Sequence, residues 1–541
     1  MKDISSTGSF VDFTLENFIY VDKTVYIPQL VKLKRVFISR PRRFGKSLTL
    51  DTIATLFETG VEPYFKGTWI YDKWTEPTYP VLRLNFLNFD KNSLEKFNNK
   101  LNSKITEFAE LNHVTTYKEK EEAEDSIDHL LEQLRLENRQ IVILIDEYDC
   151  QMTANINNET LYKQFQEKIK SFYANIKDKF AIKFLGITGV TRLKDVSIFS
   201  VGSDINDITN ASAYSQMIGF TRDEIKKYYI DYLKLASSYE NNCSVGDVTD
   251  TQLESMLDMM AQNYDGYCFD EDYEKKVFST WSVNKFFQTM IEKKKVQFGE
   301  YWYDNGGLPS ILVNYLKTHE LNIFEYLDKD KFLKVSSDDF KNPTALTTIN
   351  QNVLMCQTGY LTLRSDLNKT STVALGIPNG EIYKALNRLL ANNIFKGNTD
   401  ITDDYGRSLL EVGTVDDIIN LFNSALNSVS YDNYPIVSES SVQNMLKLYL
   451  LGAHQEVLSE VHEAKGRADL VVNTDNRRIV FEFKYAKNEA EAKSKLSEAV
   501  EQIKTRDYGN ILPKKNELIR IAAVFNADPK VRAFTENQIV P

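Results

Sequence analysis

The stretch ISRPRRFGKSLTLDTIATLF, residues 38 to 57, ends an apolar run typical of a strand and begins an amphipathic helix. Between the two lies Gly45-Lys46-Ser47, the end of the pattern G-x-x-x-x-G-K-[ST], in which backbone N–H groups and the lysine bind phosphate. Arg40 occupies the position of the first glycine. Because a bare G-K-[ST] arises by chance in roughly a quarter of chains of this length, the neighbouring sequence has to decide whether the site is real.

The first two hundred residues alternate apolar runs with helical patterns. The strand candidates are nearly unbroken apolar runs, as expected for strands covered on both faces: 35–40, 80–86, 141–148 and 181–190. The helical patterns between them are Leu48–Glu58, Ser93–Leu111, Glu121–Leu136 and Thr160–Ile176. This alternation predicts an α/β domain with a doubly wound parallel sheet. We expect a fifth strand near Met217–Phe220, followed by a capping box from Thr221 to Glu224 that opens the next helix.

In this arrangement Lys46 lies where the carboxyl end of a strand meets a helix N-terminus, where free N–H groups and the helix dipole attract anions. We expect Lys46 to reach the β- and γ-phosphates of ATP and the Ser47 hydroxyl to bind Mg²⁺. Because Gly45 still allows a close backbone approach, we expect the Arg40 side chain to leave the tight turn and the Arg40→Gly protein to keep its ATP binding. The predicted nucleotide-binding loop residues are Arg43, Phe44, Gly45, Lys46, Ser47 and Leu48.

The sequence VILIDEYD, residues 142 to 149, describes a buried strand with two carboxylates at its end. We predict that Asp146 contributes to the Mg²⁺ site and that Glu147 orients and deprotonates the attacking water. A strand that runs into an acidic surface turn would explain a single Asp-Glu pair well enough. The presence of Lys46 and Ser47 upstream in the same α/β series favours the catalytic interpretation.

The next strand ends in GITGVTR, residues 186 to 192. We assign Thr188 to contact with the γ-phosphate, although a strand-end hydroxyl that satisfies a turn is about equally compatible with this pattern. Arg192 fits an exposed turn arginine better than a charge sensor.

The run from Arg40 to Ser47 resembles the PRRxGK[ST] loops of the AAA-ATPase-like family, whose members often carry this arginine. The resemblance continues through LIDEYD, GITGVTRLKDVSIFSVGSDINDIT, YDGYCF (264–269), QTGYLT (357–362) and LGIPNGEI (375–382). It implies a P-loop ATPase with ATP and Mg²⁺ as cofactors. It assigns no chemistry to individual residues of the middle region.

The pattern restarts after about residue 430. SSVQNMLKLYLLGAHQEV predicts an amphipathic helix, and GRADLVV (466–472) and IVFEFKYA (479–486) predict two strands joined by an Asn/Asp-rich turn. A helical pattern, Asn488–Lys504, and a last strand at 517–525 complete a small α/β unit.

Asp469 lies near the start of one strand of this hairpin, and Glu482 and Lys484 lie on the other. Since side chains alternate along a strand, Glu482 and Lys484 share one face. Two carboxylates that converge across a hairpin can bind Mg²⁺, and a neighbouring lysine can position or activate the water that attacks a phosphodiester. An amphipathic edge strand would explain Glu-x-Lys taken alone.

The spacing D-x12-E-x-K resembles the PD-(D/E)XK nuclease superfamily, and the AAA-ATPase-like family typically carries such a domain. The resemblance implies catalytic roles for Asp469, Glu482 and Lys484, and it makes Gln502 and Tyr508 similar to a Q…Y element. Glu463 or Glu460 is a weak candidate for a further acid, because its surroundings fit an ordinary solvated turn. The nearby histidines, His454 and His462, fit surface residues better than metal ligands.

The organisation follows from these patterns. We expect an ATPase core in residues 1–221, a mainly helical lid and connector in 222–425, and the nuclease-like domain in 426–541.

No apolar run approaches the length of a membrane span, and the four dispersed cysteines suggest neither disulfides nor a zinc site, so we expect a cytoplasmic protein. The net charge of −11 disfavours general nucleic-acid affinity, but residues 441–541, with 16 Lys+Arg and 14 Asp+Glu, permit it.

Two functions fit the sequence. The first is an ATP-driven nuclease acting on DNA or RNA, which the family resemblance would place in the handling of foreign or mobile DNA. The second is a nucleotide-switched binding protein whose nuclease fold is inactive. The survival of Asp469, Glu482 and Lys484 favours the first. The nucleic-acid substrate and the oligomeric state are left open.

Overall fold

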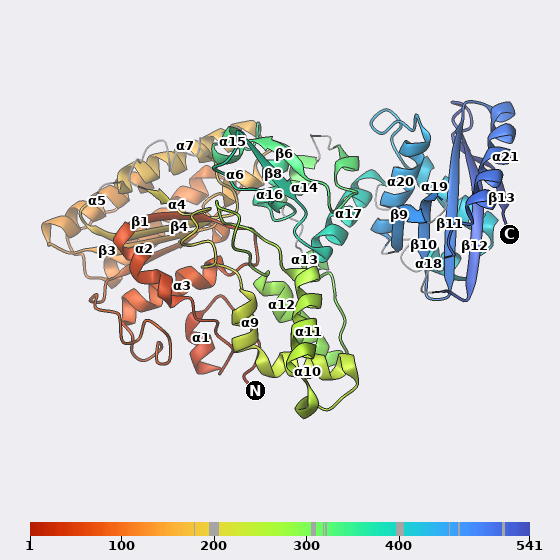
Figure 1. The fold of residues 1–541 in the computed structure, drawn as a ribbon. Helices are drawn as coiled ribbons and strands as arrows, with labels where there is room; N and C mark the ends of the chain where they lie inside the picture. The colour runs from red at the N-terminus through yellow and green to blue at the C-terminus, as the bar shows by residue number, and fades with distance from the viewer. Residues whose placement is uncertain are drawn as a thin grey trace. The chain divides into compact units, whose positions relative to one another are not determined.

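The computed structural model describes residues 1–541 apart from 178, 194–204, 305–309, 317–318, 320–321, 344, 396–404, 454, 464–465 and 511–513 (Figure 1). The chain forms two compact units. The first comprises Met1–His319 and Phe332–Ile382, and the second comprises Glu320–Lys331 and Tyr383–Pro541. No helix in the described ranges is long and apolar enough to cross a membrane.

The first unit is built on a parallel sheet of five strands in the order β2-β3-β4-β1-β5. The strands are β1 (Arg35–Ser39), β2 (Val81–Asn85), β3 (Ile141–Asp146), β4 (Ile182–Gly189) and β5 (Asn206–Asp207). All six residues of β3 are buried, as its unbroken apolar sequence predicts for a central strand. The first four strands confirm the sequence prediction, and their parallel pairing brings the carboxyl ends of β1, β3 and β4 to one edge.

The fifth predicted strand is wrong. Residues 217–219 form no strand, and Phe220 makes only an isolated bridge to Phe278. The fifth position in the sheet is taken by β5, which pairs with β1 over only two residues, too short for an apolar pattern to be visible. The backbone of Gly219 adopts a φ of +108°, which interrupts extended structure at the predicted place.

Four helices of this layer follow the predicted ranges closely: α3 (Lys46–Thr59), α4 (Leu94–Leu111), α5 (Ala123–Leu136) and α7 (Glu159–Ile176). Three shorter helices were not predicted: α1 (Phe10–Leu15), α2 (Ile27–Leu33) and α6 (Cys150–Ala154). In Figure 1, α5 and α7 lie on the side of the sheet opposite α2 and α3. Helices on both faces explain why the strands are apolar throughout, so the doubly wound α/β arrangement is confirmed.

The middle region is mainly helical, as predicted. Its elements are α9 (Arg222–Tyr228), α10 (Ile230–Asn241), α11 (Asp250–Tyr264), α12 (Thr280–Lys293), α13 (Tyr301–Asp304), α14 (Ser310–Leu316), α15 (Ser337–Lys341), α16 (Gln351–Gln357) and α17 (Gly380–Ile394). The capping box of Thr221 and Glu224 opens α9 as expected. The aromatic residues of this region, including Tyr229, Phe286 and Phe287, form a buried core, as their helical spacing predicts.

A small antiparallel sheet in the middle region was not predicted. It has the order β6-β8-β7, with β6 (Leu333–Ser336), β7 (Thr362–Leu363) and β8 (Thr372–Gly376). Strands of two to five residues are too short to show a clear alternation beside the surrounding polar sequence.

The second unit contains a mixed sheet in the order β13-β12-β11-β10-β9. The strands are β9 (Glu456–Glu463), β10 (Gly466–Asn473), β11 (Arg477–Ala486), β12 (Glu517–Asn526) and β13 (Ala533–Ile539). Strands β11 and β12 are parallel, and the other pairs are antiparallel. The helices are α18 (Tyr405–Val412), α19 (Val415–Asn427), α20 (Glu439–Gly452) and α21 (Glu489–Arg506).

The predicted hairpin, the helix α21 and the strand β12 are confirmed, whereas β9 and β13 were missed. The helix expected to run to Val457 ends at Gly452, and Val457 belongs to β9. Glu460 and Glu463 therefore lie in a strand, and the expectation of a solvated turn there is wrong. Alternation sorts the hairpin residues by face: Val480 packs with Ala499 and Ile503 of α21, whereas Phe481 contacts Phe422 of α19.

Candidate nucleotide site and candidate nuclease site

The loop between β1 and α3 has the backbone of a phosphate-binding turn. Gly45, directly before α3, adopts a φ of +103°, a conformation that favours glycine. The Lys46 side chain is buried and turns back over the loop, with Nζ donating to the carbonyls of Arg40 at 3.1 Å and Pro41 at 3.2 Å. The Lys46 ammonium is therefore held at the turn by two carbonyl oxygens, and oxygen atoms of an anion could take their place.

Predicted residues from helix α3 and from the ends of strands β3 and β4 meet at Asp146. Ser47 Oγ donates to Asp146 Oδ2 at 2.6 Å, while Thr188 Oγ1 and the Glu147 amide donate to Asp146 Oδ1. Thr188 thus bonds to the carboxylate, which neither of its two sequence interpretations anticipated. The edge where parallel strands end brings together Ser47, Asp146, Glu147 and Thr188, as the spacing of the motifs predicts.

Glu147 stands next to the lysine. Its Oε1 lies 3.7 Å from Lys46 Nζ, and its backbone has a φ of +53°. Burial raises the pKa of the Glu147 carboxyl, against the opposing effect of Lys46. A carboxylate with a raised pKa beside a cavity is a better proton acceptor than an ordinary surface glutamate.

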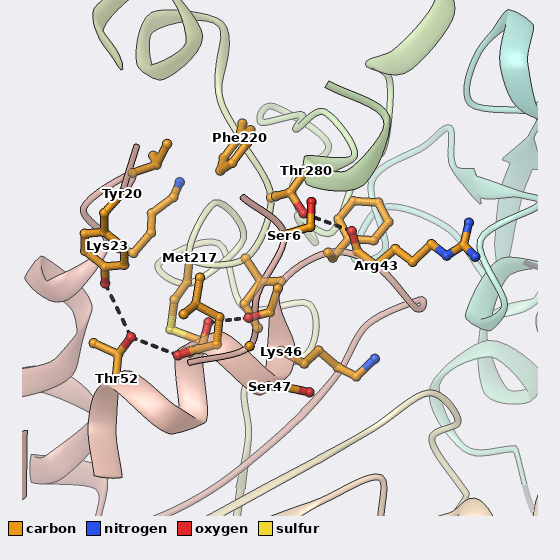
Figure 2. Close-up of a pocket in the computed structure, with 18 of the residues that line it drawn as sticks. Ser6, Tyr20, Lys23, Arg43, Lys46, Ser47, Thr52, Met217, Phe220 and Thr280 are labelled. Atoms are coloured by element: carbon orange, nitrogen blue, oxygen red, sulfur yellow. Dashed lines mark hydrogen bonds between the residues drawn. The ribbon is translucent and has the colours of Figure 1, made fainter. Parts of the chain in front are cut away.

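A cavity of about 390 Å³ opens beside the loop, and Figure 2 shows part of its lining. Gly45, Lys46, Ser47, Leu48 and Glu147 form one wall. The other walls come from Met217–Phe220, where the sequence predicted a strand, and from segments that the sequence did not single out: Ser5–Gly8, Tyr20, Lys23, Thr280, Trp281 and Asn284. No local signal marks these residues, because only the fold brings the N-terminal segment and α12 to the loop.

The side chains of Arg43 and Phe44 anchor the loop to the middle region. Arg43 Nη1 donates to the carbonyls of Tyr301 at 2.9 Å and Trp302 at 3.1 Å, and Figure 2 shows this side chain extending away from Lys46 and Ser47. Phe44 is buried with its ring centroid 4.7 Å from that of Tyr267. These two residues therefore have their backbones, rather than their side-chain ends, available to a phosphate.

Arg40 is buried behind the loop. Its Nη1 donates to the carbonyls of Ser39 at 2.9 Å and Thr209, and its guanidinium lies 4.2 Å from the ring centroid of Phe269. Burial lowers the pKa of Arg40 to about 9. The side chain leaves the turn as expected and is only 1% exposed, so its removal would leave a cavity behind the loop.

Arg192 is not the exposed turn residue that we expected. Its guanidinium forms an ion pair with Asp207 of β5, and its side chain is only 24% exposed. The Gln357 side chain accepts a hydrogen bond from the Arg192 amide and donates one to its carbonyl, both at 3.2 Å. The loop after β4 is thereby tied to α16.

In the second unit, the pairing of Leu470 with Phe481 places Asp469 beside Glu482 on neighbouring strands. Asp469 Oδ2 accepts from the Phe483 amide at 2.8 Å, and Lys484 Nζ lies 3.0 Å from Glu482 Oε1. Burial and the nearby Asp469 carboxylate raise the pKa of Glu482 to about 7, although Lys484 opposes the shift. The three predicted nuclease residues are thus brought together.

One oxygen of this cluster suits a metal ion. Glu482 is 0% exposed, and its Oε2 has no hydrogen-bond partner in the part of the chain that the structure describes. A buried carboxylate oxygen without a donor is costly unless a cation or water completes it. Among the described residues, however, no group of three or more His, Cys, Asp or Glu side chains is close enough to hold a metal.

The other acids and histidines considered in the sequence cannot be placed at this site. Glu460, Glu463 and His462 have side chains outside the described part, and His454 lies outside the described residues.

Helix α20 contributes two residues that sequence reasoning missed. Glu439 Oε1 lies 3.2 Å from Lys484 Nζ, and Gln443 Nε2 donates to the Asp469 carbonyl at 2.5 Å. Their spacing of four residues, which places them on one helix face, was the available signal. On α21, Gln502 Nε2 lies 3.4 Å from the hydroxyl of Tyr508, and Arg506 donates to the same hydroxyl at 2.8 Å.

Comparison with known families identifies two parts of the chain. Residues 5–199 match the family described as Predicted AAA-ATPase, and residues 437–535 match the PD-(D/E)XK nuclease superfamily. The chain therefore combines an AAA-ATPase-like domain with a PD-(D/E)XK nuclease-like domain. It is also similar to an uncharacterized protein in the vnfD 5′ region of Azotobacter chroococcum mcd 1, with 26% identity over 533 residues, covering 95% of this chain and 94% of that protein.

Three solved structures show weak similarity. Cdc6p from Pyrobaculum aerophilum is 11% identical, with a TM-score of 0.27 over 69% of this chain and 96% of that one. ORC2 of Aeropyrum pernix is 11% identical, with a TM-score of 0.28 over 68% and 91%. ORC1 of the same organism, in complex with DNA, is 9% identical, with a TM-score of 0.26 over 71% and 97%. TM-scores this low carry no conclusion about this chain.

The burial of Arg40 leads to a prediction. Arg40→Gly removes two hydrogen bonds and the stacking on Phe269 and leaves a cavity, so we expect the free energy of unfolding to fall by about 2–4 kcal/mol. Urea denaturation of the full chain measures this loss. Arg42→Ala, in the same loop but partly exposed, is the control and should change the value by no more than about 0.5 kcal/mol. Equal stability of Arg40→Gly and the wild type would contradict the assignment.

Proposed function

We propose that the first unit binds and hydrolyses ATP, and that its nucleotide state controls Mg²⁺-dependent cleavage of nucleic acid by the second unit. The observation that carries the proposal is the junction at Asp146, where Ser47 is bonded at 2.6 Å while Lys46 stands 3.7 Å from Glu147 beside a cavity. We assign the ATPase core to residues 1–221, the helical lid and connector to 222–425, and the nuclease to 426–541.

The residues present fit ATP and Mg²⁺. A cavity of about 390 Å³ lies within the range that small-molecule sites occupy. The Ser47 hydroxyl and the Asp146 carboxylate are oxygen ligands of the kind that Mg²⁺ prefers, and bound Mg²⁺ would supply charge that stabilises the transferring phosphoryl group. Thr188, by donating to Asp146 Oδ1, orients the carboxylate for this role.

The division of labour follows from the contacts. Lys46 holds the phosphates by charge, since its present partners are two carbonyls and a carboxylate that a triphosphate would displace. Glu147 accepts the proton of the attacking water, because its raised pKa makes it a stronger base. Arg43, Phe44, Gly45 and Leu48 hold or line the loop that receives the nucleotide.

At the nuclease site, Asp469 and Glu482 would hold Mg²⁺, whose chemistry there is to polarise the phosphodiester and activate water. Glu482 Oε2, which accepts no hydrogen bond from the residues that the structure describes, supports this fit. Lys484, next to both acids, stabilises negative charge that develops in the transition state or positions the water. The substrate class is a DNA or RNA phosphodiester, and handling of foreign or mobile DNA is the proposed context. Four free cysteines in the described part of the chain support a reducing, cytoplasmic location.

One observation favours a second function. Lys484 pairs with both Glu482 and Glu439, so the acidic cluster carries its own counterion without a metal. A nuclease fold used only for docking would have the same property. The second candidate is therefore a nucleotide-switched binding protein with an inactive nuclease fold.

Two variants test the ATP site. Lys46→Ala should weaken nucleotide binding, because it removes the charge that holds the phosphates. Glu147→Gln should leave affinity intact and slow hydrolysis by about 10²-fold or more, since it removes only the base. Binding of a fluorescent ATP analogue and phosphate release measure the two effects. The assignment fails if both variants bind and hydrolyse ATP like the wild type.

Three variants test the nuclease site. Asp469→Ala and Glu482→Ala should each abolish Mg²⁺-dependent cleavage, whereas Lys484→Ala should retain Mg²⁺ binding and lose rate. The assay uses plasmid, linear and single-stranded DNA and RNA, with circular dichroism to verify folding. Absence of cleavage by the wild type with every metal and nucleotide would favour the binding protein.

Control of the nuclease by nucleotide is the most demanding expectation. The Glu147→Gln protein, saturated with ATP, should cleave at a rate different from the same protein without nucleotide, because hydrolysis no longer resets the bound state. Cleavage kinetics with and without ATP measure the difference. Suppose that cleavage requires Asp469, Glu482 and Lys484 yet ignores nucleotide: the domains are then fused without coupling, and the ATP-driven mechanism is wrong.

A further inference from the structure

Three stretches that the family resemblance left without a role, YDGYCF (264–269), QTGYLT (357–362) and LGIPNGEI (375–382), lie around the back of the phosphate loop. Phe269 stacks on Arg40, and Tyr267 contacts the ring of Phe44. A Cβ atom at Gly359 would stand 2.9 Å from Pro41 Cβ, so the second stretch also touches the loop. The third stretch contains a buried carboxyl, Glu381.

Glu381 is 2% exposed and holds the peptide between Tyr301 and Trp302, at the start of α13. Its Oε1 accepts a hydrogen bond from the Trp302 amide at 2.8 Å, and its Oε2 accepts one from Ser282 Oγ of α12 at 2.7 Å. Burial raises the pKa of Glu381 to about 8, so the group is mostly a neutral acid near pH 7. A buried acid with both oxygens bonded fixes the position of its donors.

The same peptide is held from the other side by the phosphate loop. Arg43 donates to the carbonyls of Tyr301 and Trp302, and its guanidinium lies 4.7 Å from the ring centroid of Trp281. The backbone of Arg43 has a φ of +68°, which is uncommon for a residue with a side chain, and its carbonyl accepts from Thr280 Oγ1 at 2.9 Å (Figure 2). This strained backbone precedes Gly45 by two residues, so its anchoring sets the conformation of the loop.

Glu381 also stands in the first turn of α17. This helix begins at Gly380 in the first compact unit, and its residues from Tyr383 onward belong to the second. A change in the phosphate loop that moves Arg43 therefore has a continuous route of hydrogen bonds to the start of that helix.

We propose that Glu381 is a positioning residue for nucleotide binding, which acts through Trp302 and Arg43 to fix the phosphate loop and to join it to α17. The proposal rests on the proposed ATP site and adds a residue, Glu381, that connects the phosphate loop to the first turn of α17. The hydrogen-bond acceptors of the side chain, rather than its charge, perform this role.

The test compares Glu381→Ala with Glu381→Gln in the full chain. Loss of both acceptors in Glu381→Ala frees the 301–302 peptide, so we expect the affinity for a fluorescent ATP analogue to fall about tenfold. Glu381→Gln keeps an acceptor and the shape of a neutral acid, so its affinity should stay within about twofold of the wild type. Arg43→Lys combined with Glu381→Ala should lose less than the sum of the two single changes in binding free energy, because both act on one peptide.

A control separates positioning from general destabilisation. Met290→Ala removes a fully buried side chain of α12, so it should lower the thermal midpoint without changing nucleotide affinity. If Glu381→Ala does not fold, Ser282→Ala removes only one of the two bonds and should weaken affinity about threefold.

The possible outcomes separate the positioning role of Glu381 from the proposed ATP binding on which it rests. A wild-type protein that binds no ATP overturns both. A wild-type protein that binds ATP, with Glu381→Ala and Ser282→Ala binding equally well, overturns the positioning role alone. Equal weakening by Glu381→Gln and Glu381→Ala would also overturn it, because the acceptor would then be irrelevant.

Discussion

The carboxylate of Asp146 accepts hydrogen bonds from Ser47 Oγ, Thr188 Oγ1 and the Glu147 amide, and so ties helix α3 and strand β4 to the end of strand β3. Each donor comes from a different part of the chain, and they meet only because parallel strands end at a common edge. The loop, Glu147 and the cavity wall all take their positions from this edge. The chemistry of the first unit is therefore a consequence of strand direction as much as of residue type.

The sequence predicts well whatever depends on long periodic segments. Strands β1 to β4, the helices between them and the hairpin that carries Asp469 and Glu482 follow from apolar runs and alternation. Strand β5 is two residues long, and β9 follows a helix whose apolar pattern runs into it, so neither produces a separate signal. The cavity walls from Ser5–Gly8 and α12 could not be predicted, because tertiary folding alone brings them to the loop.

Both sites pair a lysine with a glutamate whose pKa is raised by burial, but the pairs differ in what is left open. At the nucleotide site, Lys46 Nζ is 3.7 Å from Glu147, and the lysine also bonds to two carbonyls. At the nuclease site, Lys484 is 3.0 Å from Glu482, and one oxygen of that acid has no partner among the described residues. The partners of Lys46 are thus two carbonyls and a carboxylate, whereas Glu482 keeps one carboxylate oxygen that accepts no hydrogen bond within the described part of the chain.

The irregular phosphate loop contacts residues far downstream within the first compact unit. A glycine at position 40 would fix nothing outside the turn, whereas Arg40, Arg43 and Phe44 all bury side chains against residues beyond position 264. Their partners, Phe269, Trp302 and Tyr267, are aromatic groups that stay in place only when the middle region is folded. The loop conformation that receives phosphate thus depends on residues far downstream in the sequence. The same contacts hold the loop and the middle region. A change in the packing of the middle region therefore changes the conformation of the loop, and a change in the loop changes that packing.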